Sequence, residues 1–208
     1  MTERKNHWDK VYASTSPLEV SWYQQDPALS LKLIRDAGLE SGDSVIDVGG
    51  GASTLVDSLL DAGHTALTVL DVSASALAHA RQRLGEKASA VEWIEADVTA
   101  FDPPGRFELW HDRAVYHFLT GKKDRQCYVA SMERALRSGG RAIIMTFAIG
   151  GPEKCSGLDI VQYDEPKLLG ELGPNFELCA TGHEVHATPA GGEQKFAWFL
   201  LRYTAGQR

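Results

Sequence analysis

The chain has 208 residues, of which 43% are apolar and 24% are charged, and its formal net charge is −7 at pH 7. This length and composition predict one globular domain, residues 1–208, and the negative charge disfavours a nucleic-acid substrate. No apolar run approaches the ~20 residues that span a bilayer, and no signal-peptide core follows Met1, so we expect a cytoplasmic protein without a membrane partner.

Residues 1–40 are rich in Trp and Tyr and precede the first predicted sheet strand, so we expect an N-terminal cap over a ligand crevice. Residues 41–208 alternate between helices and short apolar strands, as in a core whose parallel sheet is covered on both faces. The predicted helices are Ala28–Ala37, Thr54–Ala62, Ala74–Leu84, Arg125–Leu136 and Asp164–Leu172. The predicted strands are Val45–Val48, Ala66–Asp71, Val91–Ala96, Phe107–Asp112, Arg141–Phe147, Phe176–His186 and Lys195–Thr204.

Residue types at the element ends support this order. Ser73 is a favourable N-cap for the helix at Ala74, and Gly139-Gly140 indicates a helix stop followed by a turn. The short link at 188–193 predicts that the last two strands form an antiparallel hairpin. The predicted fold class is therefore α/β, a Rossmann-like, doubly wound and mostly parallel seven-stranded sheet with an antiparallel C-terminal hairpin.

The most informative segment runs from a buried strand into the turn Gly49–Gly51, and a second strand ends at Asp71. Bare glycine backbone lets a nucleotide approach closely, and an acid after the second strand can bind a ribose. A dinucleotide fingerprint needs a third glycine where Thr54 stands. Asp47 disfavours a pyrophosphate and favours a cation, which points to the sulfonium of S-adenosylmethionine over NAD. A glycine turn without any nucleotide is the remaining alternative.

Three motifs together resemble the class I S-adenosylmethionine-dependent methyltransferases: Asp-x-Gly-Gly-Gly-x-Ser at 47–53, the acid Asp71, and Glu-Ala-Asp-Val at 95–98. The resemblance covers nearly the whole chain and implies a seven-stranded sheet and S-adenosylmethionine as the cofactor. It also implies where the cofactor binds. The methionine part would meet Asp47, Gly49, Gly50 and Gly51, the ribose would meet Asp71 and Val72, and the adenine would meet Asp97 and Val98.

Weaker signals concern the subfamily. The segments His7–Tyr12, 22–25, 110–114 and 125–128 resemble the thiopurine methyltransferases. The N-terminal Trp-Asp-x-x-Tyr also resembles the seven-strand lysine methyltransferases, although those usually carry Asp-Lys-Gly-Thr after the fourth strand, where this chain has Asp-Arg-Ala. Trp22 and Tyr23 are expected either to close over the cofactor or to anchor the N-terminal segment to the core.

The fourth predicted strand ends at His111-Asp112-Arg113, which we expect to point into the crevice beside the transferred methyl group. These three residues are the catalytic candidates. Asp112 would position the acceptor, His111 would serve as a base, and Arg113 would either bind an anionic acceptor or pair with an acid. A second candidate base, His117, is expected rather to pack near Phe118.

The segment Gly150–Gly157 follows the fifth strand and predicts a shaped turn or a mobile lid at the acceptor pocket, with Cys155 as a bystander thiol. No metal site is predicted. His183 and His186 are three apart on a strand and face opposite sides, and the three cysteines form no C-x-x-C pair.

The sequence thus predicts an S-adenosylmethionine-dependent methyltransferase that acts on a small-molecule acceptor, with a thiol or another soft nucleophile as the first hypothesis. A thiol of pKa ~8.5 is partly ionised at neutral pH, whereas a lysine amine of pKa ~10.4 needs a base. A protein-lysine methyltransferase is the alternative within this class. An NAD(P)-dependent oxidoreductase and a non-catalytic nucleoside-binding protein are alternatives of another class.

Overall fold

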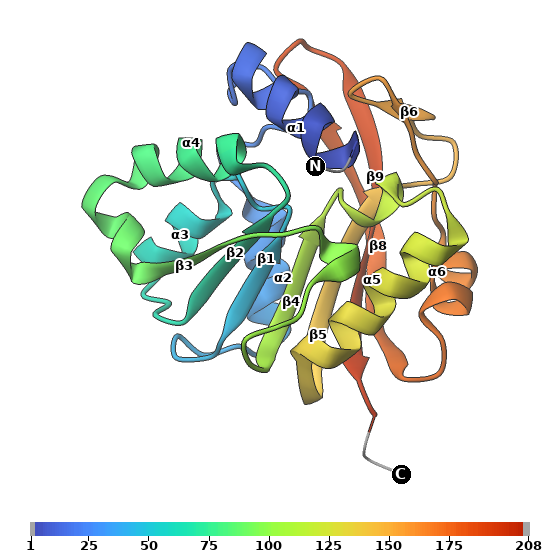
Figure 1. The fold of residues 1–208 in the computed structure, drawn as a ribbon. Helices are drawn as coiled ribbons and strands as arrows, with labels where there is room; N and C mark the ends of the chain where they lie inside the picture. Colours follow the sequence, from blue (N-terminus) through green and yellow to red (C-terminus); the bar gives the residue numbers. More distant parts are fainter. Residues whose placement is uncertain (1–2, 206–208) are drawn as a thin grey trace.

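Seven strands form one twisted sheet, and the carboxyl ends of its parallel strands meet along one edge (Figure 1). The computed structural model describes residues 3–205. In spatial order the strands are β3 (Val91–Glu95), β2 (Leu67–Asp71), β1 (Val45–Val48), β4 (Phe107–Arg113), β5 (Leu136–Phe147), β9 (Glu193–Tyr203) and β8 (Phe176–Ala187). The first five are parallel, and β9 runs antiparallel between β5 and β8. The predicted doubly wound sheet with an antiparallel C-terminal hairpin is therefore confirmed.

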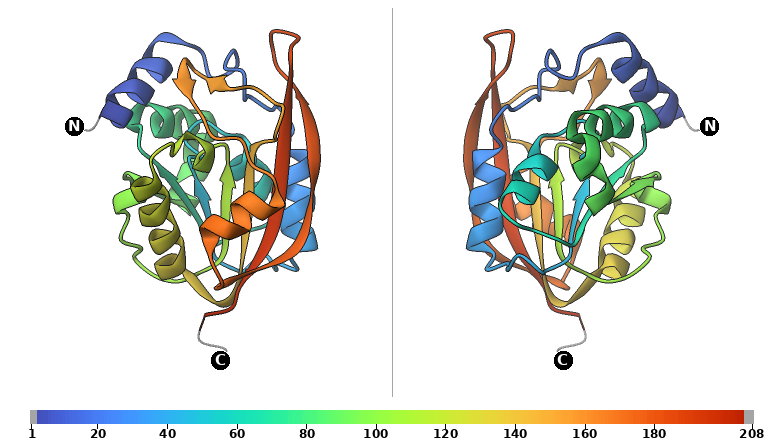
Figure 2. Two further views of the ribbon diagram at one scale, coloured as in Figure 1. Left: turned by 90° about the vertical axis from the view of Figure 1, so that its right-hand side faces the viewer. Right: turned by 90° about the vertical axis from the view of Figure 1, so that its left-hand side faces the viewer.

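Helices cover both faces of the sheet (Figure 2). One face packs against α2 (Ala28–Asp36), α3 (Leu55–Asp61) and α4 (Ala74–Leu84), and the other against α5 (Lys122–Ala135) and α6 (Glu165–Leu172). Along β1, Val45 belongs to the first of these cores and Ile46 to the second, because neighbouring residues of a strand point to opposite faces. This alternation decides below which side chains reach a common site.

Most predicted elements agree with the structure to within three residues, and Ser73 caps α4 by accepting from the Ala76 N–H at 3.2 Å. The predicted stop at Gly139-Gly140 is wrong. Helix α5 already ends at Ala135, and β5 begins at the next residue. Gly139 lies inside β5 with φ +82°, near the register shift between Phe107 and Leu109 of β4, so the glycine marks an irregular stretch of strand.

The residues predicted as an N-terminal cap divide into two parts. Helix α1 (Glu3–Ser14), which the sequence pattern did not predict, lies over the carboxyl ends of the strands, whereas α2 packs on the face of the sheet (Figures 1 and 2). Leu33 and Ile34 of α2 are fully buried in the core. Residues 15–27 connect the two helices and contribute Trp22 to the site described below.

Short elements complete the fold. Among residues 3–205, η2 (Val98–Ala100) and η3 (Tyr116–Phe118) are 3-10 turns that follow β3 and β4 at the edge of the crevice, and η1 (Gly85–Ala90) is a 3-10 turn that leads into the amino end of β3. The predicted glycine-rich loop forms a small hairpin of β6 (Lys154–Cys155) and β7 (Leu158–Asp159). This hairpin reaches α1, since Ser156 Oγ lies 3.4 Å from His7 Nε2. Between residues 3 and 205, no helix is both long and apolar enough to cross a membrane.

The packing of α2 predicts the effect of truncating its buried face. We expect Leu33→Ala to lower the free energy of unfolding by about 2–5 kcal/mol, because the substitution leaves a cavity in the core. The control Lys32→Ala, at an exposed position of the same helix, should change it by less than about 1 kcal/mol. Urea denaturation measures both. An unchanged midpoint for Leu33→Ala would mean that α2 is not part of the core.

Candidate functional site

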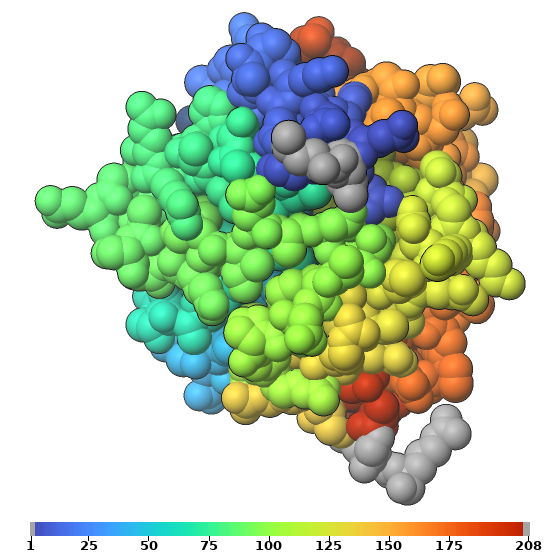
Figure 3. All heavy atoms as spheres, in the orientation of Figure 1, coloured from blue at the N-terminus to red at the C-terminus, as the bar shows by residue number. Residues whose placement is uncertain are grey.

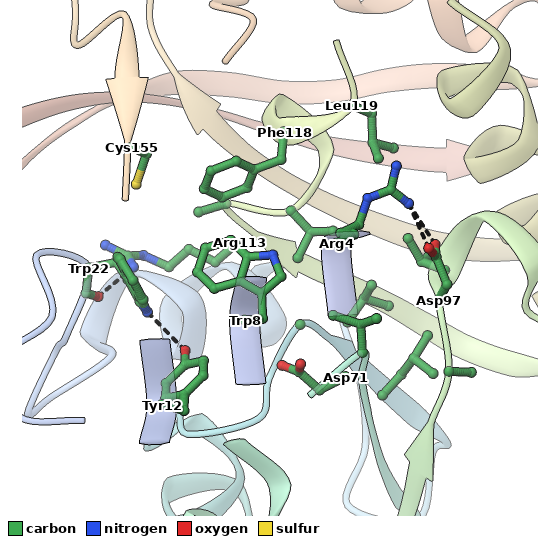
Figure 4. Close-up of a pocket in the computed structure, with 18 residues that line it drawn as sticks. Arg4, Trp8, Tyr12, Trp22, Asp71, Asp97, Arg113, Phe118, Leu119 and Cys155 are labelled. Carbon is green, nitrogen blue, oxygen red and sulfur yellow. Dashed lines mark hydrogen bonds and ion pairs between the residues drawn. The ribbon is translucent and has the colours of Figure 1, made fainter. Parts of the chain in front are cut away.

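A cavity lies at the carboxyl ends of the central strands, beneath α1 (Figure 4). The strands and the loops that follow them supply Val48, Gly49, Leu70, Asp71, Val72, Ala96, Asp97, Val98, Arg113, Ala114, Val115, Phe118 and Leu119. The roof and one side consist of Arg4, Trp8, Tyr12, Trp22 and Cys155. In the space-filling view, the N-terminal segment fills the space between α4 and the β6–β7 hairpin (Figure 3). We call the cavity beneath this segment the main cavity.

A second, smaller cavity, which we call the side cavity, adjoins the main cavity at Gly49 and Arg113 and lies between the glycine turn and residues 17–30. It is lined by Tyr12, Pro17, Val20, Trp22, Tyr23, Gln24, Pro27, Ser30, Asp47, Val48, Gly49, Gly50, Ala52, Ser53, Thr54, Leu55, His111 and Arg113. The predicted cofactor residues are thus distributed over the two cavities. Asp71, Val72, Asp97 and Val98 line the main one, Asp47, Gly50 and Tyr23 line the side one, and Gly49 and Trp22 border both.

The glycine turn is shaped by contacts that a side chain would prevent. Gly49 has φ +68°, and a Cβ there would collide with Val115. A Cβ on Gly50 would collide with the carboxylate of Asp47, and one on Gly51 would collide with Ala76 and Asp71. Gly51 lines neither cavity, but its N–H donates to Asp71 Oδ2 at 3.0 Å. The turn therefore brings bare backbone against two acids.

Asp71 is buried at the end of β2 and lines the main cavity. Its Oδ1 accepts from the Ser73 N–H at 2.8 Å, while its Oδ2 accepts from Gly51. Burial raises the pKa of this carboxyl to about 6, although the two backbone donors oppose the shift. Backbone donors thus fix the orientation of Asp71 at the cavity wall.

Asp97 lies beyond the end of β3 and is held by α1. Arg4 Nη1 donates to both of its carboxylate oxygens at 2.7 and 2.8 Å, and Arg4 Nη2 donates to Asp124 at 2.7 Å. Lys5 forms a second link, with its Nζ 2.6 Å from Glu95. These contacts could not be predicted from the sequence, because Arg4 is one charge among several in a polar helix. The acid predicted to meet an adenine therefore already has a guanidinium partner.

His111 and Asp112 point to opposite faces of the sheet, as consecutive strand residues do. Asp112 lies on the α5 side, fully buried and outside both cavities. It accepts from the N–H groups of Val115 (2.8 Å) and Tyr116 (3.0 Å) and from Tyr128 Oη (2.6 Å). The expected contact of Asp112 with an acceptor is thereby corrected: in this arrangement the carboxylate holds the turn that forms the cavity wall.

His111 lies on the α2 side and reaches the side cavity. Its Nδ1 is 2.7 Å from Asp47 Oδ1, and its Nε2 is 2.9 Å from Ser30 Oγ. Both ring nitrogens are thus engaged, which leaves no lone pair for an acceptor's proton in this arrangement. Ser30 was not singled out from the sequence. The signal was a serine on the otherwise apolar inner face of a predicted helix, beside Leu33 and Ile34.

Arg113 borders both cavities and is largely buried. Its Nη1 donates to the Trp22 carbonyl at 2.9 Å, and its guanidinium lies 4.7 Å from the centre of the Phe196 ring. Nη2 is 4.0 Å from Glu184 Oε2, and Nε and Nη2 have no hydrogen-bond partner among the described residues. Burial lowers the pKa of this arginine to about 10. The side chain thus brings a cation with unsatisfied donors to the junction of the cavities.

Aromatic rings form much of the roof. Trp22 Nε1 donates to Tyr12 Oη at 3.2 Å, and the Trp22 ring meets Trp8 edge to face at 5.6 Å. Trp8 also packs edge to face on Phe118 at 5.0 Å. Trp22 therefore joins the N-terminal segment to the core, as one of the two predicted alternatives states, and it also borders both cavities.

The remaining candidates are placed away from free solvent or from the site. Cys155 borders the main cavity, and burial raises the pKa of its thiol to about 11. His117 is fully buried near Phe118, where its Nδ1 accepts from the Phe147 N–H at 3.2 Å. His183 is exposed on β8 while His186 is buried, as expected for opposite faces of a strand. Among residues 3–205, no group of three or more His, Cys, Asp or Glu could hold a metal ion.

Comparison with known proteins gives a consistent result. Residues 45–140 match a family model described as a methyltransferase domain. Over 148 residues the chain is 26% identical to an "eEF1A lysine and N-terminal methyltransferase" of Danio rerio, a match that covers 69% of this chain and 21% of the relative. The chain thus spans about a fifth of the length of that curated relative.

Solved structures with the same architecture cover almost the whole chain. One, from a study of the conversion of a disulfide bond into a thioacetal group during echinomycin biosynthesis, has a TM-score of 0.79 at 18% identity and covers 98% of this chain and 94% of its own. Another is the N-methyltransferase NodS of Bradyrhizobium japonicum WM9 in complex with S-adenosylhomocysteine, with a TM-score of 0.70, 16% identity and coverage of 97% and 99%. At these identities the likeness establishes the shared fold.

The burial of His117 predicts an acid-dependent loss of stability. Burial lowers its pKa from 6.5 to about 3, so the folded protein binds fewer protons than the unfolded chain between these values. The free energy of unfolding therefore carries no cost from this imidazole above pH 6.5, and it decreases as the pH falls below that value. Between pH 7 and 5, we expect the free energy of unfolding of wild type to fall by about 2 kcal/mol more than that of His117→Asn. The amide oxygen of the asparagine can still accept from the Phe147 N–H. Urea denaturation of both proteins at the two pH values measures this difference.

The matched control is His183→Asn, at the exposed position on β8. Between pH 7 and 5, the difference in free energy of unfolding between His183→Asn and wild type should change by less than about 0.5 kcal/mol. A difference between wild type and His117→Asn that did not change with pH would contradict the shifted pKa of His117.

Proposed function

We propose that this chain is a class I S-adenosylmethionine-dependent methyltransferase and that it transfers the methyl group to a small-molecule acceptor with a soft nucleophile such as a thiol. The observation that carries the proposal is the pair of adjoining cavities at the carboxyl ends of the central strands, which meet at Gly49. Ligands of doubly wound sheets bind at this edge, where the strand order changes direction between β1 and β4.

The residues present fit the cofactor. Asp47 Oδ2 is a buried acceptor without a partner among the described residues, and a carboxylate in that state needs a donor. We assign the ammonium of the methionine part to Asp47, beside Gly49 and Gly50 in the side cavity. Gly51 contributes by orienting Asp71 through its N–H. When bound, S-adenosylmethionine supplies an electrophilic methyl group on a sulfonium.

The nucleoside part is assigned to the main cavity. Asp71 and Val72 would bind the ribose, and Asp97 and Val98 would meet the adenine. Asp97 Oδ1 already accepts from Arg4 and from the N–H and hydroxyl of Thr99, whereas Oδ2 accepts from Arg4 alone, so Oδ2 has a lone pair to share with an exocyclic amine. Trp22 and Tyr23 would close the side of the methionine part and exclude water from it.

The state of the candidate bases favours an acceptor that ionises by itself. Among the described residues that line the main cavity, no imidazole with a free nitrogen is present, and the carboxylate of Asp71 is bound by two backbone donors. Both nitrogens of His111 are engaged. A thiol of pKa ~8.5 needs little help to lose its proton, whereas a lysine amine of pKa ~10.4 needs a base.

The charge and walls of the site agree with an ionised sulfur. Arg113 brings unsatisfied N–H groups to the junction of the cavities, where it would bind an anionic acceptor and favour a thiolate. Trp8, Trp22 and Phe118 provide apolar walls for a polarizable nucleophile. A structural neighbour from a study of disulfide-to-thioacetal conversion offers a precedent for sulfur chemistry on this fold.

Protein-lysine methylation is the second candidate, and it rests on the Danio rerio relative, which is described as acting on a lysine and an N-terminus. That reaction would require a base that this arrangement does not offer, so side chains of the site would have to rearrange on binding. A non-catalytic nucleoside-binding protein is the remaining alternative. Methyl transfer to any acceptor would exclude it, and cofactor binding without transfer would support it.

Loss of the Asp71 carboxylate should weaken cofactor binding. We expect Asp71→Ala to lower the affinity for S-adenosylhomocysteine by about 1–3 kcal/mol, because the ribose loses an acceptor and the glycine turn loses its partner. The exposed control Glu86→Ala should leave the affinity unchanged. Isothermal titration calorimetry measures both. Equal dissociation constants for Asp71→Ala and wild type would show that Asp71 does not bind this ligand.

The acceptor class is tested with an isotopically labelled methyl donor and three acceptor sets: small thiols, small amines and lysine peptides. We expect transfer to thiols, with a rate that rises with pH until the thiol is ionised. Transfer to lysine peptides alone would favour the second candidate. Cofactor binding without transfer to any set would favour the non-catalytic alternative, and binding of NADH in place of S-adenosylhomocysteine would contradict the family assignment.

A further inference from the structure

Three buried polar side chains form a continuous hydrogen-bonded chain beside the side cavity. Ser30 Oγ lies 2.9 Å from His111 Nε2, and His111 Nδ1 lies 2.7 Å from Asp47 Oδ1. All three residues are at most 4% exposed. A carboxylate oxygen only accepts, so Nδ1 carries the proton of the second bond.

The fold determines that these residues meet. Asp47 of β1 and His111 of β4 are register partners on adjacent parallel strands, and both point to the face that α2 covers. Ser30 comes from the buried side of α2, next to Leu33 in the same helix. Because Gly50 has no Cβ, the Asp47 carboxylate fits against the glycine turn.

The chain ends on one unsatisfied atom. Asp47 Oδ1 is occupied by the imidazole, whereas Oδ2 is buried and has no partner among the described residues. A buried acceptor of this kind is costly unless a ligand supplies a donor. The adjoining space is the side cavity, whose lining includes Asp47, His111 and Ser30.

We propose that His111 and Ser30 are positioning residues that hold Asp47 with Oδ2 free for the ammonium of the cofactor's amino-acid part. The inference rests on the proposed function. The imidazole N–H fixes one carboxylate oxygen, and the serine hydroxyl fixes the imidazole from its other nitrogen, so neither ring nor carboxylate can rotate without losing a buried hydrogen bond. His111 is thus a positioning residue, whereas the sequence predicted that it would act as a base.

The order Ser–His–Asp is also that of a hydrolytic triad. A nucleophilic serine would have to face a substrate carbonyl beside N–H donors for an oxyanion. Ser30 lies instead in the first turn of α2, fully buried, and its hydroxyl also contacts Met145 Sδ at 3.8 Å. The arrangement therefore fits a support for Asp47 better than a nucleophile.

Two substitutions of His111 separate its two hydrogen bonds. The amide of asparagine takes the place of Nδ1 and can still donate to Asp47, whereas the amide of glutamine takes the place of Nε2 and reaches Ser30. Two ligands separate the parts of the cofactor, since S-adenosylhomocysteine carries the amino-acid part and 5′-methylthioadenosine lacks it. Calorimetry with both ligands, together with thermal unfolding of each variant, tests the proposal.

We expect His111→Gln to weaken S-adenosylhomocysteine binding about tenfold or more and to leave 5′-methylthioadenosine binding within about twofold. His111→Asn should retain S-adenosylhomocysteine binding within about threefold. Asp47→Asn should behave like His111→Gln. The double variant that carries both substitutions should lose no more affinity for S-adenosylhomocysteine than either single variant, because both remove the same interaction. Ser30→Ala should have a smaller effect of the same selectivity.

Equal weakening of both ligands by His111→Gln, or no weakening of S-adenosylhomocysteine, would overturn the proposal. If His111→Gln failed to fold, Ser30→Ala and His111→Asn would still decide it through the same pair of ligands. Failure of wild type to bind either ligand would contradict the proposed function itself, which keeps the two failures distinct.

Discussion

Buried carboxylates at the carboxyl ends of the parallel strands have to find donors, and how each one does so organises the site. Asp112 receives three donors and becomes a structural element of the cavity wall. Asp71 receives two backbone donors and still lines the main cavity. Asp97, which is only partly buried, is held by Arg4, and the buried Asp47 retains one oxygen without a partner among the described residues. Asp112, Asp71 and Asp97 have a donor for each carboxylate oxygen and help to build the site. Asp47 has one oxygen without a donor, so it is the acid that most needs a ligand.

Much of the fold could be predicted from the sequence. Short apolar strands, glycine turns and Ser73 as a helix cap are local signals, and the structure confirms the elements that they mark. The methyltransferase family inferred from the glycine turn and the acids after β2 and β3 agrees with the methyltransferase-domain match over residues 45–140. Helix α1 was not predicted because its sequence has little amphipathic pattern and its position depends on ion pairs with distant acids.

The chemistry of the site was harder to predict, because it depends on which face of a strand each residue occupies. His111 and Asp112 are adjacent in the sequence, and both were expected beside the methyl group. In the sheet they meet different partners, Ser30 and Asp47 on one face and Tyr128 on the other. The register of β1 against β4 and the packing of α2 decide this, and neither is a local property of the sequence.

The position of β9 constrains how the molecule is completed. This strand follows β8 in the chain but lies between β5 and β8 in the sheet. During synthesis β5 and β8 therefore emerge without their shared neighbour; β5 can pair only with β4, and β8 has no strand partner until residues 193–203 arrive. The long-range contacts that close the sheet are thus among the last to form, and until then two strand edges are open to pairing with other chains, a state in which a chaperone would have most to protect.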